Sequence, residues 1–576
     1  MTPIDPATAL LPRFRDALGR AFGEEHAGAD PMVRRSDRAD LQVNVALGLG
    51  KKLGQPPRQV AEALVKALQV DDLVERIEIA GPGFLNMTLR ADWLGAAADR
   101  ALEDDRLGVP FADKLDRVVI DYSSPNVAKE MHVGHLRSTV IGDALARTLG
   151  FLGHTILRQN HLGDWGTPFG MLIEHLLDLG ESASAEVSVG ELAAFYKAAR
   201  SKFDSDPGFA ERSRKRVVSL QGGDAETLRL WRILVDASQK YFEKVYALLG
   251  TQLVREDVCG ESFYNPRLQP LAEELEREGK AQIDQGALCL FVPGFKNKDG
   301  SPLPLIVRKA DGGFGYAATD LAGVRYRVGE LHATRILVVV GAPQAQHLAM
   351  IFAGSRVCGW LPENVRCEHV AFGSVLGTDK RMFRSRSGES ARLIDLIEEA
   401  IDRARAEVEK RWPDIDPETK ASMAKAVGVG AIKYADLSSD RVKDYVFDLD
   451  RMVQFEGNTG GYLQYAHARP RSILRKAGED RPAGKISPTE KAERALVLEL
   501  LSFGATVQAV GETLEPHRLC GYLYNLAARY NEFYDQCPVL KAEGEVRASR
   551  LRLCALTART LEQGLSLLGI AAPDRM

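Results

Sequence analysis

The sequence predicts an α/β protein whose central domain is built on a parallel sheet, with a smaller α+β region before it and an all-helical region after it. Three observations support this fold class. An apolar run at 118–120 precedes a turn and a helical pattern, and a continuous apolar run at 336–340 is typical of a strand buried on both faces. From about residue 390 the apolar spacing is almost wholly helical. Strand, helix and strand in this order open a Rossmann-like, nucleotide-binding sheet.

Residues 1–112 are expected to form the α+β region. Helical patterns lead to a strand-like segment at 80–89, which a Gly-Pro-Gly turn opens. Basic residues gather in this region, and charge alone explains them as solvated surface: Arg34, Arg35, Arg38, Lys51 and Lys52.

Residues 113–390 are expected to form the central domain. Its second strand is predicted at 154–158, and a charged, mostly helical stretch around 185–280 carries no chemical motif and indicates an insertion. Further strands are expected at 287–292, 305–308 and 336–340. Two helical parts follow, a connecting segment at 391–455 and a bundle at 456–576.

Composition sets the remaining bounds. The 576 residues suggest three or four domains, and 27% charged with 45% apolar residues is ordinary for a soluble protein. No apolar run approaches the ~20 residues of a membrane span, and the first 15 residues lack a signal core, so a cytosolic protein is expected. Seven scattered cysteines without a Cys-x-x-Cys pair predict reduced thiols. A net charge of −4 means that any RNA contact must use local basic surfaces.

The segment from Asp121 to His135 is the most informative motif. It places two imidazoles and a glycine at the junction between a strand and a helix, where unpaired N–H groups and partial positive charge favour phosphate. His132 and His135 would add donors, while Gly134 would let a nucleotide approach closely. Taken alone, His-x-Gly-His also arises by chance, and paired histidines bind metals.

The longer block Ser-Ser-Pro-Asn-x-Ala-Lys-x-x-His-x-Gly-His-Leu-Arg-Ser-Thr, at 123–139, resembles the signature of arginyl-tRNA synthetases, which are class I aminoacyl-tRNA synthetases. Val133 replaces the usual isoleucine, and the match continues through Asn160-His-Leu-Gly-Asp-Trp-Gly166 and in segments up to Met576. The resemblance implies an arginine–tRNA ligase. Such an enzyme makes arginyl-adenylate from ATP and L-arginine and transfers the arginyl group to the 3′ end of tRNA(Arg). Mg²⁺ would accompany ATP, with no dedicated protein metal site.

By this resemblance, His132 and His135 stabilise the phosphate in the transition state. The second class I signature, Lys-Met-Ser-Lys-Ser, is missing, and a basic segment at 380–388 stands in its place. Ser385, flanked by Arg384 and Arg386, would contact the triphosphate. Without the family, this segment is an exposed basic turn. Lys129, just before the histidines, matches a lysine thought to compensate.

The resemblance also predicts the amino-acid pocket. Tyr316 and Asp320 match an element that contacts the guanidinium, and their i, i+4 spacing puts both on one side of a helical turn. Alone, such a pair indicates a helix start with a surface tyrosine. The other matching positions are Asn126, Gln344, Asp121 and Ser123 for arginine, and His347 for ATP. A core histidine is the alternative for His347, and a single charge partner would not exclude lysine.

A tRNA-binding end is predicted in the last domain. Tyr462, Tyr465 and Arg469 share a helical stripe with Ile473 and Lys476, and aromatic and basic groups together suit unpaired RNA. Core packing is the alternative, and Pro470 should bend or start a helix there. In the family, the matching helix and the last residue, here Met576, lie by the anticodon loop, while the first domain touches the corner of tRNA.

Two rival functions are distinguishable. A small nucleotidyltransferase with the same His-x-Gly-His motif would lack the helical last third and the Tyr316 and Asp320 element. A catalytically silent paralogue that only binds tRNA would have lost a histidine or the acidic pocket. The expected protein is therefore a cytoplasmic, monomeric ligase without membrane contact.

Overall fold

The computed structural model describes residues 4–36, 38–166, 168–180, 192–383 and 392–576. The chain forms two compact units. One contains residues 1–111, 454–567 and 571–576, and the other contains residues 112–453 with 568–570. The first and last parts of the chain therefore share one unit, although their sequences suggested separate domains.

The larger unit is built on a four-stranded parallel sheet in the order β11 (Arg366–Phe372), β10 (Arg335–Gly341), β5 (Arg117–Asp121) and β6 (Thr155–Gln159). Val118, Val119 and Ile120 of β5 are fully buried, as expected for a central strand. Helix α5 (Val133–Phe151) joins β5 to β6. The predicted Rossmann-like sheet is confirmed, and its strand carboxyl ends meet at one edge.

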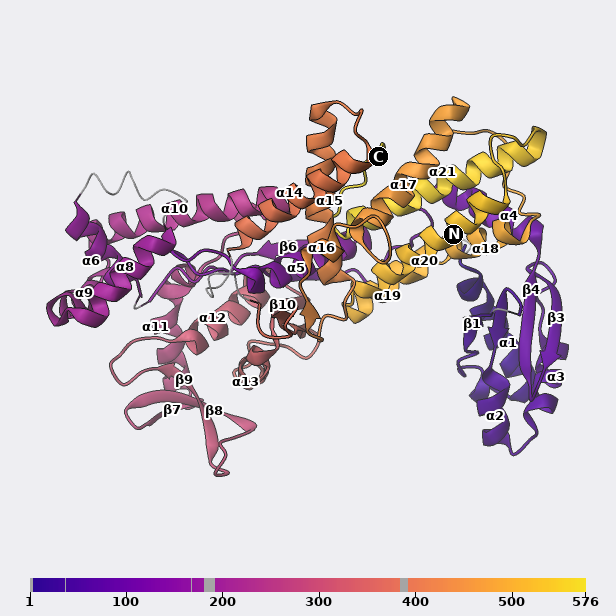
Figure 1. The fold of residues 1–576 in the computed structure, drawn as a ribbon. Helices are drawn as coiled ribbons and strands as arrows, with labels where there is room; N and C mark the ends of the chain where they lie inside the picture. The colour runs from indigo at the N-terminus through magenta and orange to yellow at the C-terminus, as the bar shows by residue number, and fades with distance from the viewer. Residues whose placement is uncertain (1–3, 37, 167, 181–191, 384–391) are drawn as a thin grey trace. The chain divides into compact units, whose positions relative to one another are not determined.

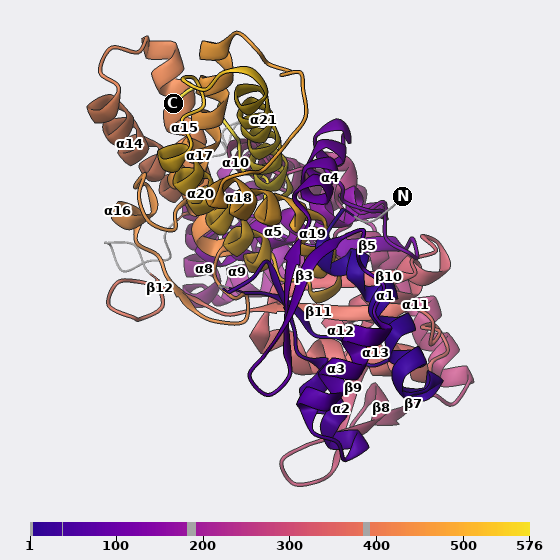
Figure 2. The same ribbon diagram turned by 90° about the vertical axis from the view of Figure 1, so that its right-hand side faces the viewer.

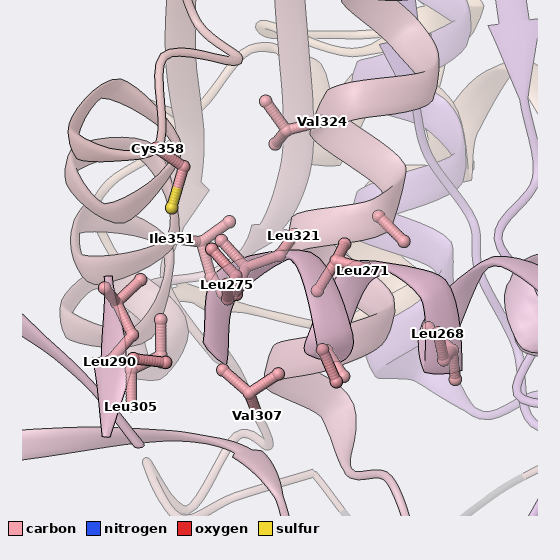
Figure 3. Close-up of a cluster of buried hydrophobic side chains, with 14 of the residues drawn as sticks. Leu268, Leu271, Leu275, Leu290, Leu305, Val307, Leu321, Val324, Ile351 and Cys358 are labelled. Carbon is pink, nitrogen blue, oxygen red and sulfur yellow. The ribbon is translucent and has the colours of Figure 1, made fainter. Parts of the chain in front are cut away.

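A second sheet belongs to the same unit. The strands β7 (Ala281–Asp284), β8 (Ala287–Lys296) and β9 (Pro302–Arg308) are antiparallel and separate from the parallel sheet. They pack on three helices, α11 (Glu261–Arg277), α12 (Tyr316–Gly329) and α13 (Ala345–Val357). Figure 3 shows side chains from both groups converging in one core, among them Leu271, Leu290, Leu321 and Ile351. This core holds the start of α12 in place.

The rest of the larger unit is mostly helical (Figure 1). The predicted insertion contains α8 (Leu192–Ser205), α9 (Pro207–Gln221) and α10 (Ala225–Leu249), after α6 (Pro168–Leu179). The connecting segment contains α14 (Leu393–Arg411), α15 (Pro417–Leu437) and the short α16 (Leu449–Met452). Two short strands, β12 (Val375–Leu376) and β13 (Tyr445–Val446), pair in parallel.

The smaller unit combines an antiparallel sheet with a helical bundle. Its strands run in the order β1 (Val33–Arg35), β2 (Leu41–Val43), β4 (Phe84–Leu89) and β3 (Val74–Ala80), and the Gly-Pro-Gly turn joins β3 to β4, the strand expected after it. The helices that precede the larger unit in the sequence are α1 (Pro6–Phe22), α2 (Val45–Leu53), α3 (Pro57–Ala67) and α4 (Ala91–Glu103). The bundle, seen in Figure 2, consists of α17 (Gly460–Ala477), α18 (Lys491–Leu501), α19 (Phe503–Thr513), α20 (His517–Gln536) and α21 (Gly544–Leu567).

Ion pairs join the two parts of the smaller unit. Arg494 of α18 donates to Asp40 at 2.8 Å, and Arg552 of α21 donates to Asp99 of α4 at 2.9 Å. Arg35 pairs with Glu499 at 2.5 Å, so this member of the basic group is not simply solvated surface. These contacts connect residues more than 400 positions apart in the chain, which local sequence patterns do not reveal.

One apolar helical stretch and the seven cysteines are mostly buried in the interior of the protein. The stretch Lys491–Thr513 has the length and hydropathy of a candidate membrane span, but 61% of its most apolar window is buried inside the unit, as in a core helix. None of the seven cysteines, all of which lie in described parts of the chain, forms a disulfide, and six of them are buried. The expectation of reduced thiols is confirmed.

Close packing between β5 and α5 generates the first prediction. A Cβ added at Gly142 of α5 would lie 2.3 Å from the buried Tyr122 ring, so Gly142→Ala should push the helix off the sheet. We expect a loss of about 1–3 kcal/mol in the free energy of unfolding, measured by urea denaturation. Gly150→Ala, on the same helix, is the control, because its Cβ would meet Ile156 at an ordinary 3.5 Å. If both variants retain full stability, the tight approach is wrong.

Candidate active site

The two histidines form the first turn of α5. The backbone N–H of Gly134 donates to Nδ1 of His132 at 3.0 Å, and the backbone N–H of His132 donates to Nδ1 of His135 at 3.1 Å. The two imidazole rings lie 4.0 Å apart between centroids. A Cβ on Gly134 would come within 2.8 Å of the His132 ring, so the glycine makes room for that ring. Side chains thus cap two amides that a helix start leaves unpaired.

These bonds determine which nitrogen of each ring carries the proton. Because both Nδ1 atoms accept hydrogen bonds, each neutral ring carries its proton on Nε2. Burial, followed by the charges of His132 and Lys129, lowers the pKa of His135 to about 3. Partial desolvation and then Lys129 lower the pKa of His132. At neutral pH the site therefore offers two uncharged N–H donors beside a positive helix end and a lysine ammonium.

The loop from β5 to α5 has an unusual backbone. Ser123, Ser124 and Ala128 all have left-handed φ values, of 72°, 47° and 60°. Buried contacts hold them: the Ser123 hydroxyl bonds Tyr246 at 2.7 Å, and the Ala128 N–H donates to Ser238 of α10 at 2.9 Å. The observed contacts of Ser123 are thus structural, and its contact with arginine stays a prediction. Strained loops that the surroundings hold in place are common at functional sites.

Asp121 ends β5 and is buried beneath this loop. Its Oδ2 accepts from Arg327 of α12 at 2.5 Å, and its Oδ1 accepts from the Ser124 hydroxyl at 2.9 Å. Burial opposes ionisation, but Arg327 and His161 outweigh it, so the pKa of Asp121 is lowered. The carboxylate joins β5 to α12, and its predicted contact with arginine stays a prediction.

The segment after β6 supports the other side of the loop. The Val127 N–H donates to Gly163 O at 3.0 Å, and the Gly163 N–H donates to Pro125 O at 3.1 Å. A Cβ on Gly163 would lie 2.2 Å from Oδ1 of Asn126, so this glycine leaves space for the Asn126 amide. Asn126 is exposed, as a side chain that contacts a substrate must be.

Tyr316, Asp320 and His347 come together at the starts of α12 and α13. Tyr316 is the first residue of α12 and is 75% exposed, which leaves its ring accessible. Asp320, one turn later, bonds Nε2 of His347 at 2.6 Å, and this bond raises the pKa of His347. His347 was predicted for the ATP site, whereas its observed partner belongs to the predicted arginine pocket. Gln344 is exposed at the N-cap of α13.

An open hollow of about 600 Å³ adjoins this group. It lies among β9, the first turn of α12 and the start of α13, and its walls include Lys309, Tyr316, Pro343 and His347. The hollow leaves the tyrosine ring open to a ligand from the solvent side.

Glu261 is a candidate functional residue that sequence reasoning missed. It is the first residue of α11, and burial, followed by the carboxylates of Asp164 and Asp320, raises its pKa to about 8. Asp164 accepts from both the backbone and the hydroxyl of Ser262, at 2.8 and 2.7 Å, and so holds this helix start. Glu261 therefore lies in an acidic environment with Asp320, where a cation would be stabilised. A glutamate after Gly260 gives no signal in the sequence.

The predicted triphosphate residues Arg384, Ser385 and Arg386 lie outside the described residues. The described residues on either side are anchored: Phe383 N–H donates to Val375 O at 3.0 Å, and Leu393 N–H donates to Met131 O at 2.7 Å. Arg392 forms a backbone bridge with His132 itself. Lys129 is exposed, with its ammonium 5.0 Å from the Tyr196 ring centre.

The predicted tRNA residues lie together on the smaller unit. Arg469 donates to Asn531 Oδ1 at 2.7 Å, the Asn531 amide donates to the Tyr462 hydroxyl at 2.9 Å, and the guanidinium is 5.1 Å from the Tyr465 ring centre. Ile473 of the same stripe is buried, and α17 continues through Pro470. The chain's end follows this helix, because Arg475 donates to Asp574 O at 2.8 Å, two residues before Met576.

Three known protein families match successive parts of the chain. The family described as tRNA synthetases class I (R), catalytic domain, matches residues 98–449. An arginyl tRNA synthetase N terminal domain matches residues 9–89, and a DALR anticodon binding domain matches residues 463–576.

Individual relatives agree over nearly the full length. The arginine–tRNA ligase of Thermobifida fusca (strain YX) is 56% identical over 577 residues, 99% of this chain and 100% of the relative. That of Frankia casuarinae is 50% identical over 96% of each chain. The solved arginyl-tRNA synthetase of Plasmodium falciparum has a TM-score of 0.84 at 27% identity over 100% of both chains, and that of Thermus thermophilus has 0.81 at 28% over 98% and 99%.

The lowered pKa of His135 predicts that the free energy of unfolding depends on pH. The pKa of His135 is about 3 when folded and ~6.5 when unfolded, so its stability contribution is full above pH 6.5 and is lost as pH falls towards 3. Between pH 7 and pH 5 we expect the unmodified protein to lose about 1–2 kcal/mol more unfolding free energy than His135→Asn. Urea denaturation at both pH values measures this. Equal losses in the two proteins would show that the ring is protonated in the fold.

Proposed function

The chain belongs to the arginyl-tRNA synthetases, class I ligases that join L-arginine to tRNA(Arg) with ATP, and we propose that its first step takes place over the start of α5. In that step the arginine carboxylate attacks the α-phosphorus of ATP. A bond forms from carboxylate oxygen to phosphorus while the bond to pyrophosphate breaks. The activated arginyl group then passes to a ribose hydroxyl at the 3′ end of tRNA, and AMP leaves.

The observation that carries this proposal is the pair of tethered, neutral imidazoles. Their Nδ1 atoms are occupied by backbone amides, so their Nε2–H groups are the donors available to phosphate oxygens. These donors are held in place before the reaction begins and act where negative charge develops. Such a donor contributes ~10²–10³ in rate. Lys129 would add charge, and Arg384, Ser385 and Arg386 are proposed to contact the rest of the triphosphate.

Recognition of arginine is proposed to use two carboxylates. Asp320, with Tyr316 one turn before it, would meet one edge of the planar guanidinium, and Glu261 would meet another. Lysine has a single point charge and would leave one of these carboxylates unpaired, which is costly in a buried site. Asn126, Gln344, Ser123 and Asp121 remain proposed contacts for the amino-acid end and the pocket.

The proposal also includes the metal ion that accompanies ATP, the tRNA contacts and the location of the enzyme. Within the described residues no three His, Cys, Asp or Glu side chains are grouped as an ion site requires, so Mg²⁺ is proposed to be carried by the ATP phosphates. Tyr462, Tyr465, Arg469 and Met576 are proposed to contact the anticodon loop. We place the enzyme in the cytoplasm as a monomer without membrane contact, which fits its reduced thiols and sites built from one chain.

Pyrophosphate exchange with and without cognate tRNA tests the reaction. With tRNA bound, we expect arginine-dependent exchange, and His135→Ala should lower its kcat by ~10²–10³ because the variant lacks one phosphate donor. Filter binding should show that tRNA affinity is little changed, since the proposed anticodon-loop contacts are on α17 and at Met576. Exchange that survives this substitution would contradict the histidine's role, and exchange with lysine in place of arginine would contradict the specificity.

The raised pKa of Glu261 predicts that the KM for arginine depends on pH. Only the ionised carboxylate attracts a guanidinium, and its pKa is about 8 in the free enzyme. The KM for arginine should therefore fall as pH rises from 6.5 towards 8. In Glu261→Gln the KM should be at least ~10-fold higher and nearly independent of pH in this range. Glu273→Gln, exposed on the same helix, is the matched control and should behave like the unmodified enzyme. An unchanged KM in Glu261→Gln would exclude the second carboxylate.

A further inference from the structure

Arg137 is a buried cation two residues after His135 on α5. It is the largest fully buried side chain in the described part of the protein, with 0% exposure. Its Nε lies 3.2 Å from Oδ2 of Asp436 on α15, and both side chains are almost completely inaccessible. Burying an ion pair gives little net stability, so stability alone does not account for this charge.

The same guanidinium also contacts two other segments. Its Nη1 donates to the carbonyl oxygen of Lys443 at 3.0 Å. Its centre lies 5.1 Å from the Tyr445 ring and 5.7 Å from the ring of Phe372, the last residue of β11. One side chain thus ties α5 to α15, to the 443–445 segment and to the end of a central strand. The fork geometry of arginine makes these bonds directional.

The 441–447 segment in turn sets the position of residues 371–376. Arg441 donates to Ala371 O at 2.7 Å, and Gly373 N–H donates to Arg441 O at 2.9 Å. Ser374 N–H donates to Asp444 Oδ1 at 2.6 Å, and β12 then pairs with β13 in register. The 441–447 segment, which Arg137 contacts, therefore fixes the position of the backbone that follows β11 at the carboxyl edge of the sheet.

We infer that Arg137 is a positioning residue for adenylate formation, which fixes the helix of the two histidines against the strand end at 372–376. The inference rests on the proposed function. The histidines act from one side of the sheet's carboxyl edge, and the strand end closes the neighbouring side. A misplacement of about 1 Å between them would cost ~10²-fold in rate. The guanidinium contacts should be largely unaffected, because α11, α12 and α13 are proposed to supply them.

The experiment separates positioning from stability with the double variant Arg137→Met and Asp436→Leu. Replacing both members of a buried ion pair by apolar residues largely restores stability, whereas removing one does not. We expect a thermal midpoint near that of the unmodified enzyme. The kcat for pyrophosphate exchange per titrated active site, with saturating tRNA, should fall ~10–100-fold. The KM for arginine should stay within twofold.

Lys433→Met provides the matched control. Lys433 is also fully buried on α15, where it lies 3.9 Å from Asp143 of α5 and donates to Leu249 O at 3.0 Å. Its loss should lower the thermal midpoint but leave the kcat per active site within twofold. If Lys433→Met loses as much kcat as the double variant, general packing of the two helices explains the effect and the inference is wrong.

The remaining outcomes are also decisive. A double variant with unchanged kcat per site overturns the inference. If that variant does not fold, the exposed Asp444→Ala, which removes the acceptor for Ser374, decides: a fivefold or larger loss of kcat supports positioning, and no loss overturns it. An unmodified enzyme without arginine-dependent exchange would instead contradict the proposed function.

Discussion

The site depends on the first turn of α5, where two imidazoles accept hydrogen bonds from backbone amides that have no partner within the helix. A carboxylate would cap the same amides, but it would place a negative charge where phosphate must be held. A neutral imidazole satisfies the amide through Nδ1 and keeps an Nε2–H free to donate. The helix start thereby retains its attraction for anions, and the capping groups themselves become donors. Gly134 allows this arrangement because a side chain there would displace the His132 ring.

Two buried ion pairs flank the first turn of α5. Asp121 joins the end of β5 to Arg327 of α12, and Arg137 joins α5 to Asp436 of α15. Each pair connects segments that are far apart in the chain, and the two pairs flank the loop between β5 and α5. Within the loop, bonds from Tyr246 and Ser238 hold Ser123 and Ala128, two of the three non-glycine residues with left-handed backbone angles. The strain is local, whereas the contacts that hold it come from α10, α12 and the central sheet.

Local periodicity was enough to predict the parallel sheet, the helix after β5 and the helical last third. The family resemblance singled out Tyr316 and Asp320, and their i, i+4 spacing placed both on one side of a helical turn, which is the start of α12. Long-range pairings did not follow: Arg327 with Asp121, and His347 with Asp320, are brought together only by the packing of α12 and α13. Glu261 was missed because its significance comes from neighbouring carboxylates that belong to other segments. The separate sheet of β7, β8 and β9 was also beyond local patterns, which reveal strands but not their partners.

The discontinuous smaller unit has a consequence for synthesis on the ribosome. Asp40, Arg35 and Asp99 are synthesised first, and their partners Arg494, Glu499 and Arg552 follow more than 400 residues later. The intervening residues 112–453 can form their own core first, since most of their contacts are internal. Until α18 and α21 have been synthesised, the early members of these pairs, two of them acidic and one basic, lack their partners. The smaller unit can therefore close only after α18 and α21 have been synthesised, and a product that stops before them lacks the partners of Asp40 and Asp99.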